Sequence, residues 1–292
     1  MTGERPLRIA FQGEAGSFSD EALQQLWGSE AERLPYRDFA DVTAAVAAGV
    51  ADRGVLPIEN TIVGSIAASH DAINAMPGLF AVAETVVAVH HCLLAAHTTT
   101  FGAITTVLSH PVASAQCGRF FAEHPQLEVH AVYDTAGAAM DVSRIADPNI
   151  AAVASRRAAQ FYDLAILHAD IEDRPDNQTR FLGIARAPSP LPAGTPARTM
   201  IIITAEDRPG SLLEALGVLA RYGVSIRRLE PRPTGEPWSY RFFVEFDHQV
   251  GDAAAEAVVR DISAVAAETR LLGTYPRWSA GRRGSIGWTP ES

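Results

Sequence analysis

Residues 173–186 (DRPDNQTRFLGIAR) place an amide, a hydroxyl and a guanidinium within four positions, just before an apolar segment. These groups belong to Asn177, Thr179 and Arg180. An arginine can pair with a carboxylate in bidentate geometry, and a threonine hydroxyl can donate a hydrogen bond while it stays neutral. The stretch therefore indicates either a capped loop that enters a strand, or a pocket that holds an anion and offers it a proton donor.

Three further polar clusters lie at predicted strand-to-helix junctions: GEAGSFSD (13–20), PIENTIVGS (57–65) and SHPVASAQC (109–117). In a parallel sheet such junctions meet at the carboxyl ends of the strands, where ligands usually bind. The candidate polar contacts there are Ser17, Asn60 and Ser114. Each cluster also fits a local role, because serine and asparagine cap helices and stabilise turns.

Bulk composition excludes several kinds of chemistry. The net charge of −10 disfavours a nucleic-acid partner or an anionic membrane surface. All 24 basic residues are arginine, so no lysine is present to form a Schiff base or a P-loop. The sequence contains no GxGxxG, GxSxG, HExxH or CxxC motif, and its two cysteines lack metal-ligand spacing. We therefore expect chemistry without a cofactor or a metal.

The first part of the chain alternates between strand and helix patterns. Apolar or β-branched segments are separated by helical patterns of about 10–15 residues, which predicts a largely parallel sheet covered by helices. Residues 82–96 are predicted to form one long strand or a pair of strands, and a single sheet or two smaller lobes would both fit. The start has no apolar signal core and no apolar run approaches 18 residues, so we expect a cytoplasmic protein.

The segment APSPLPAGTPA (187–197) interrupts this alternation with four prolines in eleven residues and predicts a stiff linker. Residues 198–276 then follow a βαββαβ order, which is typical of a ferredoxin-like unit. The tail, residues 277–292, is expected to be disordered. The chain should thus contain a first domain over 7–186 and a second over 198–276.

Taken together, GEAGSFSDEAL, LPIENTIVGSI, LSHPVASAQC and DNQTRFLGIAR resemble the motifs of the prephenate dehydratases, in the same order. The second domain resembles an ACT regulatory module. The resemblance implies a two-lobed, periplasmic-binding-protein-like α/β catalytic domain with a C-terminal ferredoxin-like ACT domain. It also implies conversion of prephenate to phenylpyruvate, carbon dioxide and water, with no cofactor.

The resemblance also implies roles for single residues. The catalytic group would be Thr179, as a positioned hydrogen-bond donor to the departing oxygen. The substrate-binding residues would be Asn60, Asn177, Arg180, Phe181, Ser17 and Ser114.

In the ACT family a GALV loop and an ESRP motif bind phenylalanine. The corresponding residues here are Gly210, Ser211, Leu212, Leu213, Glu230 and Arg232, with Pro231 in place of the motif serine. The resemblance implies inhibition by phenylalanine and a homodimer or homotetramer built through this domain. Two alternatives stay open: an arogenate dehydratase, which the sequence does not separate from a prephenate dehydratase, and a non-catalytic amino-acid sensor.

Overall fold

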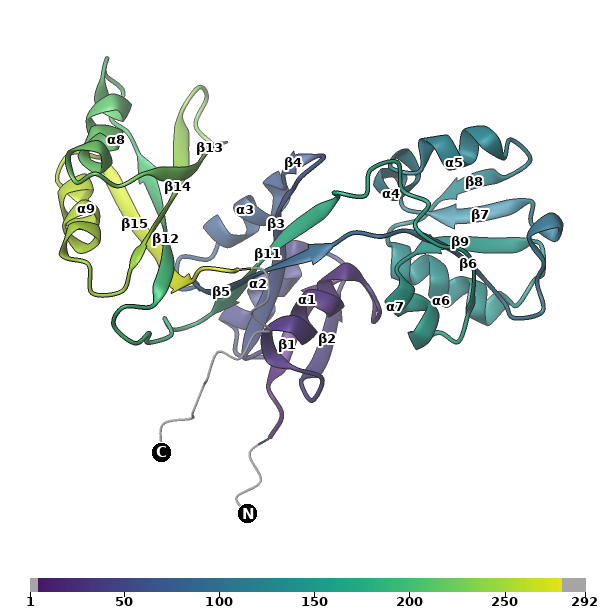
Figure 1. Ribbon diagram of the computed structural model, residues 1–292. Helices are drawn as coiled ribbons and strands as arrows, with labels where there is room; N and C mark the ends of the chain where they lie inside the picture. The colour runs from purple at the N-terminus through teal and green to yellow at the C-terminus, as the bar shows by residue number, and fades with distance from the viewer. Residues whose placement is uncertain (1–4, 280–292) are drawn as a thin grey trace.

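The computed structural model describes residues 5–279, and it places three α/β units in a row (Figure 1). We call them the first lobe (residues 5–88 and 177–186), the second lobe (92–171) and the C-terminal domain (196–276). The first lobe lies in the middle, between the other two. The predicted tail falls mostly outside the described residues, since 280–292 are not among them.

The first lobe is a mixed sheet in the order β2-β1-β3-β11-β5, with the short β4 beside β3. Its strands are β1 (Arg8–Gln12), β2 (Glu32–Tyr36), β3 (Arg53–Asn60), β4 (Gly64–Ser65), β5 (Phe80–Ala88) and β11 (Gln178–Ala185). Its helices are α1 (Phe18–Trp27), α2 (Phe39–Ala47) and α3 (Ala67–Asn74).

The second lobe has a sheet of its own, in the order β10-β6-β9-β7-β8. Its strands are β6 (Cys92–Ala95), β7 (Thr106–Ser109), β8 (Glu128–Ala131), β9 (Ile150–Ala154) and β10 (Ala165–His168). Its helices are α4 (Pro111–Ala115), α5 (Gly118–Glu123), α6 (Thr135–Ile145) and α7 (Arg156–Phe161), with a 3-10 turn η1 (Phe101–Ala103). The two-lobed α/β domain is therefore confirmed, and the single sheet is excluded.

The prediction of a largely parallel sheet is only partly right. Strand β1 pairs in parallel with β2 and β3, and β7 does so with β8 and β9. Strand β11 runs antiparallel to both β3 and β5, and β6 runs antiparallel to β9 and β10. The reason is that the chain crosses between the lobes twice: β5 leads into β6, and β11 returns to insert between β3 and β5.

Local signals explain most element boundaries. Helix α1 begins where the Ser17 side chain accepts the backbone N–H of Asp20, and it ends at Gly28, whose φ is +84°. Of the two alternatives for residues 82–96, one long strand or a pair, the structure has the pair, as β5 and β6. The single helix expected over 111–124 is wrong, because it divides at Gln116–Cys117 into α4 and α5.

The C-terminal domain has the expected βαββαβ order and the antiparallel sheet β13-β14-β12-β15. Its elements are β12 (Pro196–Thr204), α8 (Ser211–Arg221), β13 (Ile226–Pro233), β14 (Tyr240–Gln249), α9 (Ala253–Ser263) and β15 (Glu268–Pro276). Helices α8 and α9 cover one face of this sheet (Figure 1). Strand β12 begins at Pro196, inside the segment expected to be linker.

The other face of the C-terminal sheet packs on the first lobe. Met200, Phe243 and Leu272 join Leu56 and Leu182 of the first lobe in one buried apolar cluster. Strand β15 approaches β5 so closely that a Cβ on Gly273 would lie 2.2 Å from the carbonyl oxygen of Ala81. The first lobe and the C-terminal domain thus share one hydrophobic core.

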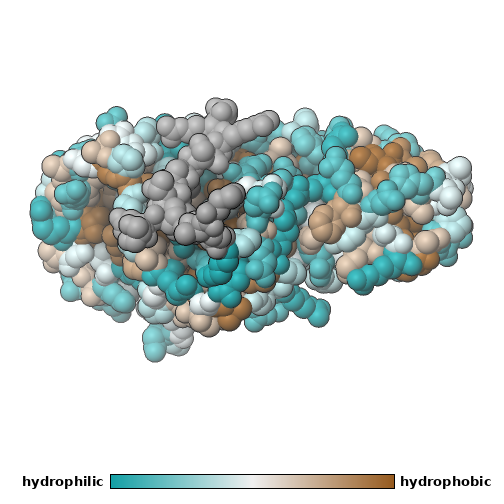
Figure 2. Space-filling model, turned by 90° about the horizontal axis from the view of Figure 1, so that it is seen from below, coloured by the Kyte–Doolittle hydropathy of each residue, from teal (hydrophilic) through white to brown (hydrophobic). Residues whose placement is uncertain are grey.

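In the face seen in Figure 2, hydrophobic side chains gather in separate patches among hydrophilic ones. Within residues 5–279, no helix is both long enough and apolar enough to cross a membrane.

Candidate active site

The carboxyl end of β3 meets the start of β11 beside the junction of the two lobes. Thr179 lies opposite Asn60 in the antiparallel register, and the next pair is Arg180 with Glu59. Phe181 then lies opposite Pro57, so the pairing skips Ile58 and forms a bulge. Bulges bend a strand locally and change the direction of its side chains. Here the bulge sets the register that places Thr179 beside Asn60.

The amide of Asn60 is held in one orientation. Its Oδ1 accepts the backbone N–H groups of Ile62 (2.9 Å) and Val63 (3.0 Å). Its Nδ2 therefore faces the other way and donates to Thr179 Oγ1 (2.9 Å) and Asn177 Oδ1 (2.8 Å). Because Thr179 Oγ1 accepts from Asn60, its own hydrogen is left to donate to another group.

Behind this pair, a chain of neutral hydrogen bonds crosses between the lobes. The fully buried Asn177 donates from Nδ2 to Gln116 Oε1 (3.1 Å), at the end of α4 in the second lobe. The same oxygen lies 2.9 Å from Nε2 of His91. Since a carbonyl oxygen only accepts, the hydrogen bonds assign the His91 proton to Nε2. Burial lowers the pKa of His91, which keeps the ring neutral.

Arg180 is not part of this cluster. Its guanidinium donates in bidentate geometry to Glu245 of β14, with both distances 2.8 Å, and also contacts Glu84 and Glu59 at 3.1 Å and 3.2 Å. Successive residues of a strand point to opposite faces of the sheet. Thr179 faces the lobe junction and Arg180 faces the C-terminal domain. The structure therefore differs from the expectation that Arg180 anchors a substrate carboxylate beside Thr179.

Phe181 points to the same face as Thr179 but lies deeper. It is 2% exposed and packs with Phe11 and Leu23 under α1. Its position is that of a core side chain, so it does not form the apolar wall expected beside the substrate.

Ser17 caps the first helix, and the backbone N–H groups around it already bind groups of the protein. Its Oγ accepts the backbone N–H of Asp20 (3.3 Å), and the N–H of Gly16 donates to the Asp20 carboxylate (2.9 Å). That carboxylate also pairs with Arg33 and with Arg157 of the second lobe. The protein thus supplies its own anion at this helix start.

Ser114 also has a local partner. Its Oγ donates to the carbonyl oxygen of Pro111 (3.0 Å) within α4. It lines a small hollow of about 430 Å³ on the second lobe, with Ala115 and Val129 in the same wall. The structure does not bring Ser114 into contact with Asn60 or Thr179.

The two lobes touch next to the cluster. Ser155 Oγ donates to the carbonyl oxygen of Gly16 (2.7 Å). Gly16 has φ +86°, and a Cβ there would lie 3.0 Å from Ala158 Cα, so a side chain would push the lobes apart. Asp134 accepts the N–H groups of Glu14 and Gly137, and burial raises its pKa.

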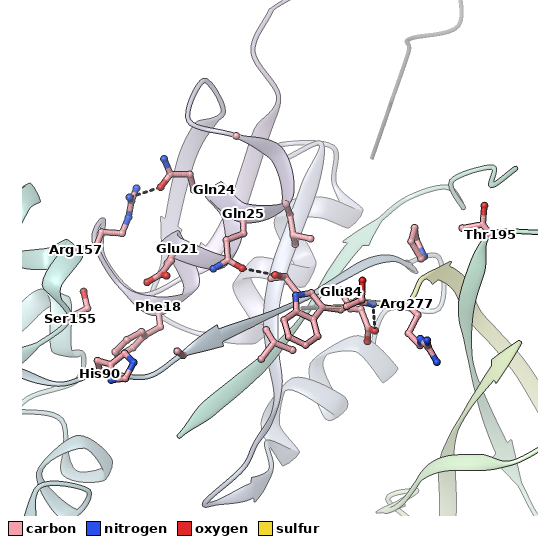
Figure 3. Close-up of a pocket in the computed structure, with 18 of the residues that line it drawn as sticks. Phe18, Glu21, Gln24, Gln25, Glu84, His90, Ser155, Arg157, Thr195 and Arg277 are labelled. Carbon is pink, nitrogen blue, oxygen red and sulfur yellow. Dashed lines mark hydrogen bonds between the residues drawn. The ribbon is translucent and has the colours of Figure 1, made fainter. Parts of the chain in front are cut away.

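A larger hollow of about 1320 Å³ begins at the lobe contact of Ser155 and extends between α1, β5, α7 and the segments around Pro190 and Trp278 (Figure 3). Its lining includes Glu21 and Glu84 but none of the residues of the Thr179 cluster. Glu84 accepts the backbone N–H of Trp278 there (2.8 Å). We therefore place the candidate active site at Thr179 and not in this hollow.

The expected effector residues lie on two different faces of the C-terminal sheet. Residues 210–213 begin α8 on the helix-covered face, with Gly210 at φ +86°. Glu230 and Arg232 of β13 point toward the first lobe, where Arg232 donates twice to Asp71 of α3 (2.6 and 2.9 Å). Within one chain, these two halves of the expected site do not meet.

Sequence patterns assign no role to His91, whereas Gln116 belongs to the third polar cluster and there could either reach a pocket or only solvate its helix. Gln116 is the last residue but one of that cluster, and its position at the end of α4 lets its side chain reach Asn177. For His91 no spacing or pattern offers a signal, because its partner lies in a distant segment of the chain.

The fold and the site together define a two-lobed α/β enzyme domain with a neutral polar cluster, joined to a ferredoxin-like domain. Residues 9–189 match the family model for prephenate dehydratase, and residues 199–264 match that for the ACT domain. The chain belongs to the prephenate dehydratase family, whose reaction makes it a carbon–oxygen lyase.

Three relatives illustrate the range of this similarity. "Arogenate dehydratase/prephenate dehydratase 2, chloroplastic" of Arabidopsis thaliana is 36% identical, over 92% of this chain and 73% of its own. The structure of prephenate dehydratase from Arthrobacter aurescens in complex with L-Phe is 31% identical, with a TM-score of 0.85 over 93% of this chain and 90% of its own. GqqA, described as a novel type of quorum quenching acylase, is 34% identical, with a TM-score of 0.84 over 94% of this chain and 100% of its own.

Proposed function

We propose that this protein is a prephenate dehydratase that converts prephenate to phenylpyruvate, carbon dioxide and water. The observation that carries the proposal is the direction of the hydrogen bonds around Thr179. Asn60 donates to the threonine oxygen, so the threonine hydrogen is available to a ligand. The family match supplies the reaction, and this geometry supplies a donor suited to it.

In the reaction the ring carboxylate leaves as carbon dioxide, and its bonding electrons aromatise the ring and expel the 4-hydroxyl group. Negative charge develops on the departing oxygen, which leaves as water after it takes up a proton. A threonine hydroxyl is too weak an acid to supply that proton itself. Thr179 therefore acts as a fixed hydrogen-bond donor to the oxygen, and such a donor is worth about 3–4 kcal/mol. The proton comes from water or from a neighbouring group.

Asn60 and Asn177 orient this donor. The Asn60 amide holds the threonine oxygen, and Asn177 holds the Asn60 amide in turn. Both side chains are at most 6% exposed, so their polar atoms are occupied by protein partners rather than by a ligand. The members of the hydrogen-bonded chain carry no charge, so they do not repel a doubly negative substrate.

Arogenate differs from prephenate by an amino group on its side chain, and the Arabidopsis relative is named for both substrates. The Thr179 geometry fits both. Comparison of kcat/KM for the two compounds decides between them.

We also propose inhibition by phenylalanine, through a dimer or tetramer formed by the C-terminal domain. The Arthrobacter relative was solved with L-Phe. Strand β13 is an edge of its sheet and exposes Ile226 and Leu229, so a second copy can pair with it. Such pairing offers a way for residues 210–213 of one copy to approach Glu230 of the other.

The experiment is a phenylpyruvate assay on the purified chain with prephenate, for the wild type and two isosteric variants. We expect Thr179→Val to lower kcat by one to three orders of magnitude, about the value of a positioned donor. Thr85→Val is the matched control, because Thr85 lies on the neighbouring strand and donates to Gln25. A wild type without turnover of prephenate, or with acylase activity instead, would contradict the proposal.

A further inference from the structure

Two residues of the C-terminal domain contact the bulge that aligns Thr179 with Asn60. One is Glu245 of β14, which reaches the bulge through Arg180. The other is Arg228 of β13, which reaches the carbonyl group of the bulged residue, Ile58. We propose that Glu245 and Arg228 are positioning residues for Thr179; this inference rests on the function proposed above.

The first contact fixes the residue next to Thr179. Arg180 lies between Thr179 and the bulge, and both ends of its guanidinium are bound by Glu245 at 2.8 Å. The side chains are 11% and 1% exposed, so water hardly competes for this pair. A bidentate ion pair fixes direction as well as distance. The backbone of β11 is therefore anchored one residue away from the reacting hydroxyl.

The second contact fixes the opposite strand. Ile58 is the residue of β3 that the ladder skips, and its carbonyl oxygen accepts from Ile66 N–H (3.0 Å) and from Arg228 Nη2 (3.3 Å). The same Nη2 donates to Ser65 Oγ (2.8 Å). Arg228 thus holds β3 and β4 together two residues before Asn60.

The C-terminal domain thereby contacts both strands that carry the catalytic pair. Strand β13 also carries Glu230 two residues after Arg228, in the motif expected to respond to phenylalanine. A shift of β13 and β14 relative to the first lobe would change the register of Thr179 and Asn60 without touching the substrate. Such a change alters kcat more than KM, because it acts on the donor in the transition state.

The test compares Glu245→Gln with Asp247→Asn in the full-length protein, assayed with prephenate. Both variants remove one negative charge from the same face of β14, but Asp247 pairs with Arg198 and not with Arg180. We expect Glu245→Gln to lower kcat about tenfold with KM nearly unchanged, and Asp247→Asn to leave both near the wild-type values. Rates are measured well below each variant's Tm and per folded enzyme.

A double-mutant cycle separates positioning from general destabilisation. If Glu245 acts through Thr179, the loss caused by Glu245→Gln should disappear in the Thr179→Val background. Equal kcat values for Glu245→Gln and Asp247→Asn, or a full loss in both backgrounds, would overturn the inference. A wild type that does not act on prephenate would instead overturn the proposed function.

If Glu245→Gln does not fold, Arg228→Gln provides the same test from the other strand. Arg228 lies 3.3 Å from the Ile58 carbonyl oxygen, so its loss should lower kcat selectively while KM is retained. An unchanged kcat for folded Arg228→Gln would overturn the inference.

Discussion

The two faces of strand β11 have opposite electrostatic surroundings. On the face of Thr179, the partners are amides, hydroxyls and a neutral imidazole that form one chain of hydrogen bonds. On the face of Arg180, the partners are three carboxylates, one of which belongs to the C-terminal domain. The neutral site at Thr179 and the ion network at Arg180 are therefore only one residue apart in the chain.

The difference shows how the molecule separates substrate binding from domain attachment. On the neutral face, the groups that hold Thr179 carry no negative charge that would repel a doubly negative substrate. The charged face, in contrast, joins the C-terminal domain to the first lobe by directional ion pairs in addition to the shared core. This arrangement also means that removal of the C-terminal domain would expose Leu56 and Leu182, so truncation is a poor test of regulation.

The charged face should show the largest effect on stability. Arg180→Met leaves Glu245, whose side chain is 1% exposed, without its bidentate counterion, and it leaves Glu84 with Arg198 alone. Burial lowers the pKa of Arg180, but Glu245 raises it more, so the guanidinium is firmly charged. Breaking a buried pair on one side costs about 3–5 kcal/mol, which urea unfolding at pH 7 would measure.

Two further variants sharpen this prediction. Arg180→Met combined with Glu245→Met should recover most of the stability, because an apolar pair can replace a buried ion pair. Arg208→Met should have no measurable effect, since Arg208 forms an exposed pair with Glu214. Equal losses for Arg180→Met and Arg208→Met would contradict the picture of a buried network.

On the neutral face of β11, an added charge should lower kcat strongly. Asn60→Asp keeps the size of the side chain but replaces the donor that faces Thr179 with an acceptor. The threonine hydrogen would then bind the introduced carboxylate rather than the departing oxygen. We expect kcat to fall by about 10²–10³, measured at saturating prephenate. Asn149→Asp adds the same charge at an exposed site of the second lobe and should leave kcat unchanged; an equal loss there would refute this prediction.

Sequence patterns identified those parts of the fold that local physics determines. The βαββαβ order of the C-terminal domain was readable because each element has its own apolar period, and Gly210 and Gly223 mark the ends of α8. The insertion of β11 between β3 and β5 was not readable. That pairing joins β11 to β3, which lies more than 100 residues earlier in the chain. The hydrophobic pattern of β11 does not indicate which strands pair with it.

The site shows the same division. Thr179 and Asn60 stand out as polar residues at predicted strand ends, the resemblance assigns their roles, and the structure brings them together. The separation of Thr179 from Arg180 did have a local signal, since adjacent strand residues face opposite sides of a sheet. What the sequence could not supply was the partner, because Glu245 lies in another domain. His91 could not be identified from the sequence for a similar reason, since its contact with Gln116 depends on how separate segments of the chain pack.

Loss of the hydrogen bonds that Gln116 makes between the lobes should have a moderate effect on kcat. Gln116→Met removes the oxygen that accepts from both His91 and Asn177, so the Asn60 amide loses its support. We expect kcat to fall about tenfold, close to the value of one hydrogen bond to a buried group. Gln116→Glu keeps an accepting oxygen and should retain kcat, while its charge raises KM for an anionic substrate. Similar kcat values for Gln116→Met and the wild type would show that the chain does not support Thr179.

The smallest expected effect is a loss of stability on acidification, with one histidine on each side of β11. Burial lowers the pKa of His91, and burial together with Arg228 lowers that of His70, which packs on Phe243 of the C-terminal domain. In the unfolded chain both would titrate near about 6.5. Below that pH the unfolded state binds more protons than the folded state, so stability falls as the pH decreases toward the lowered values.

Each histidine contributes at most about 1.4 kcal/mol per pH unit in that window. Urea unfolding between pH 7 and pH 5 would measure the slope for the wild type, His91→Gln and His70→Gln. We expect each variant to reduce the slope of the unfolding free energy against pH by the contribution of one histidine. Only His91→Gln should also lower kcat, since only His91 belongs to the hydrogen-bonded chain behind Thr179. A slope that neither substitution changes would mean that acid sensitivity arises from the carboxylates and not from the two faces compared above.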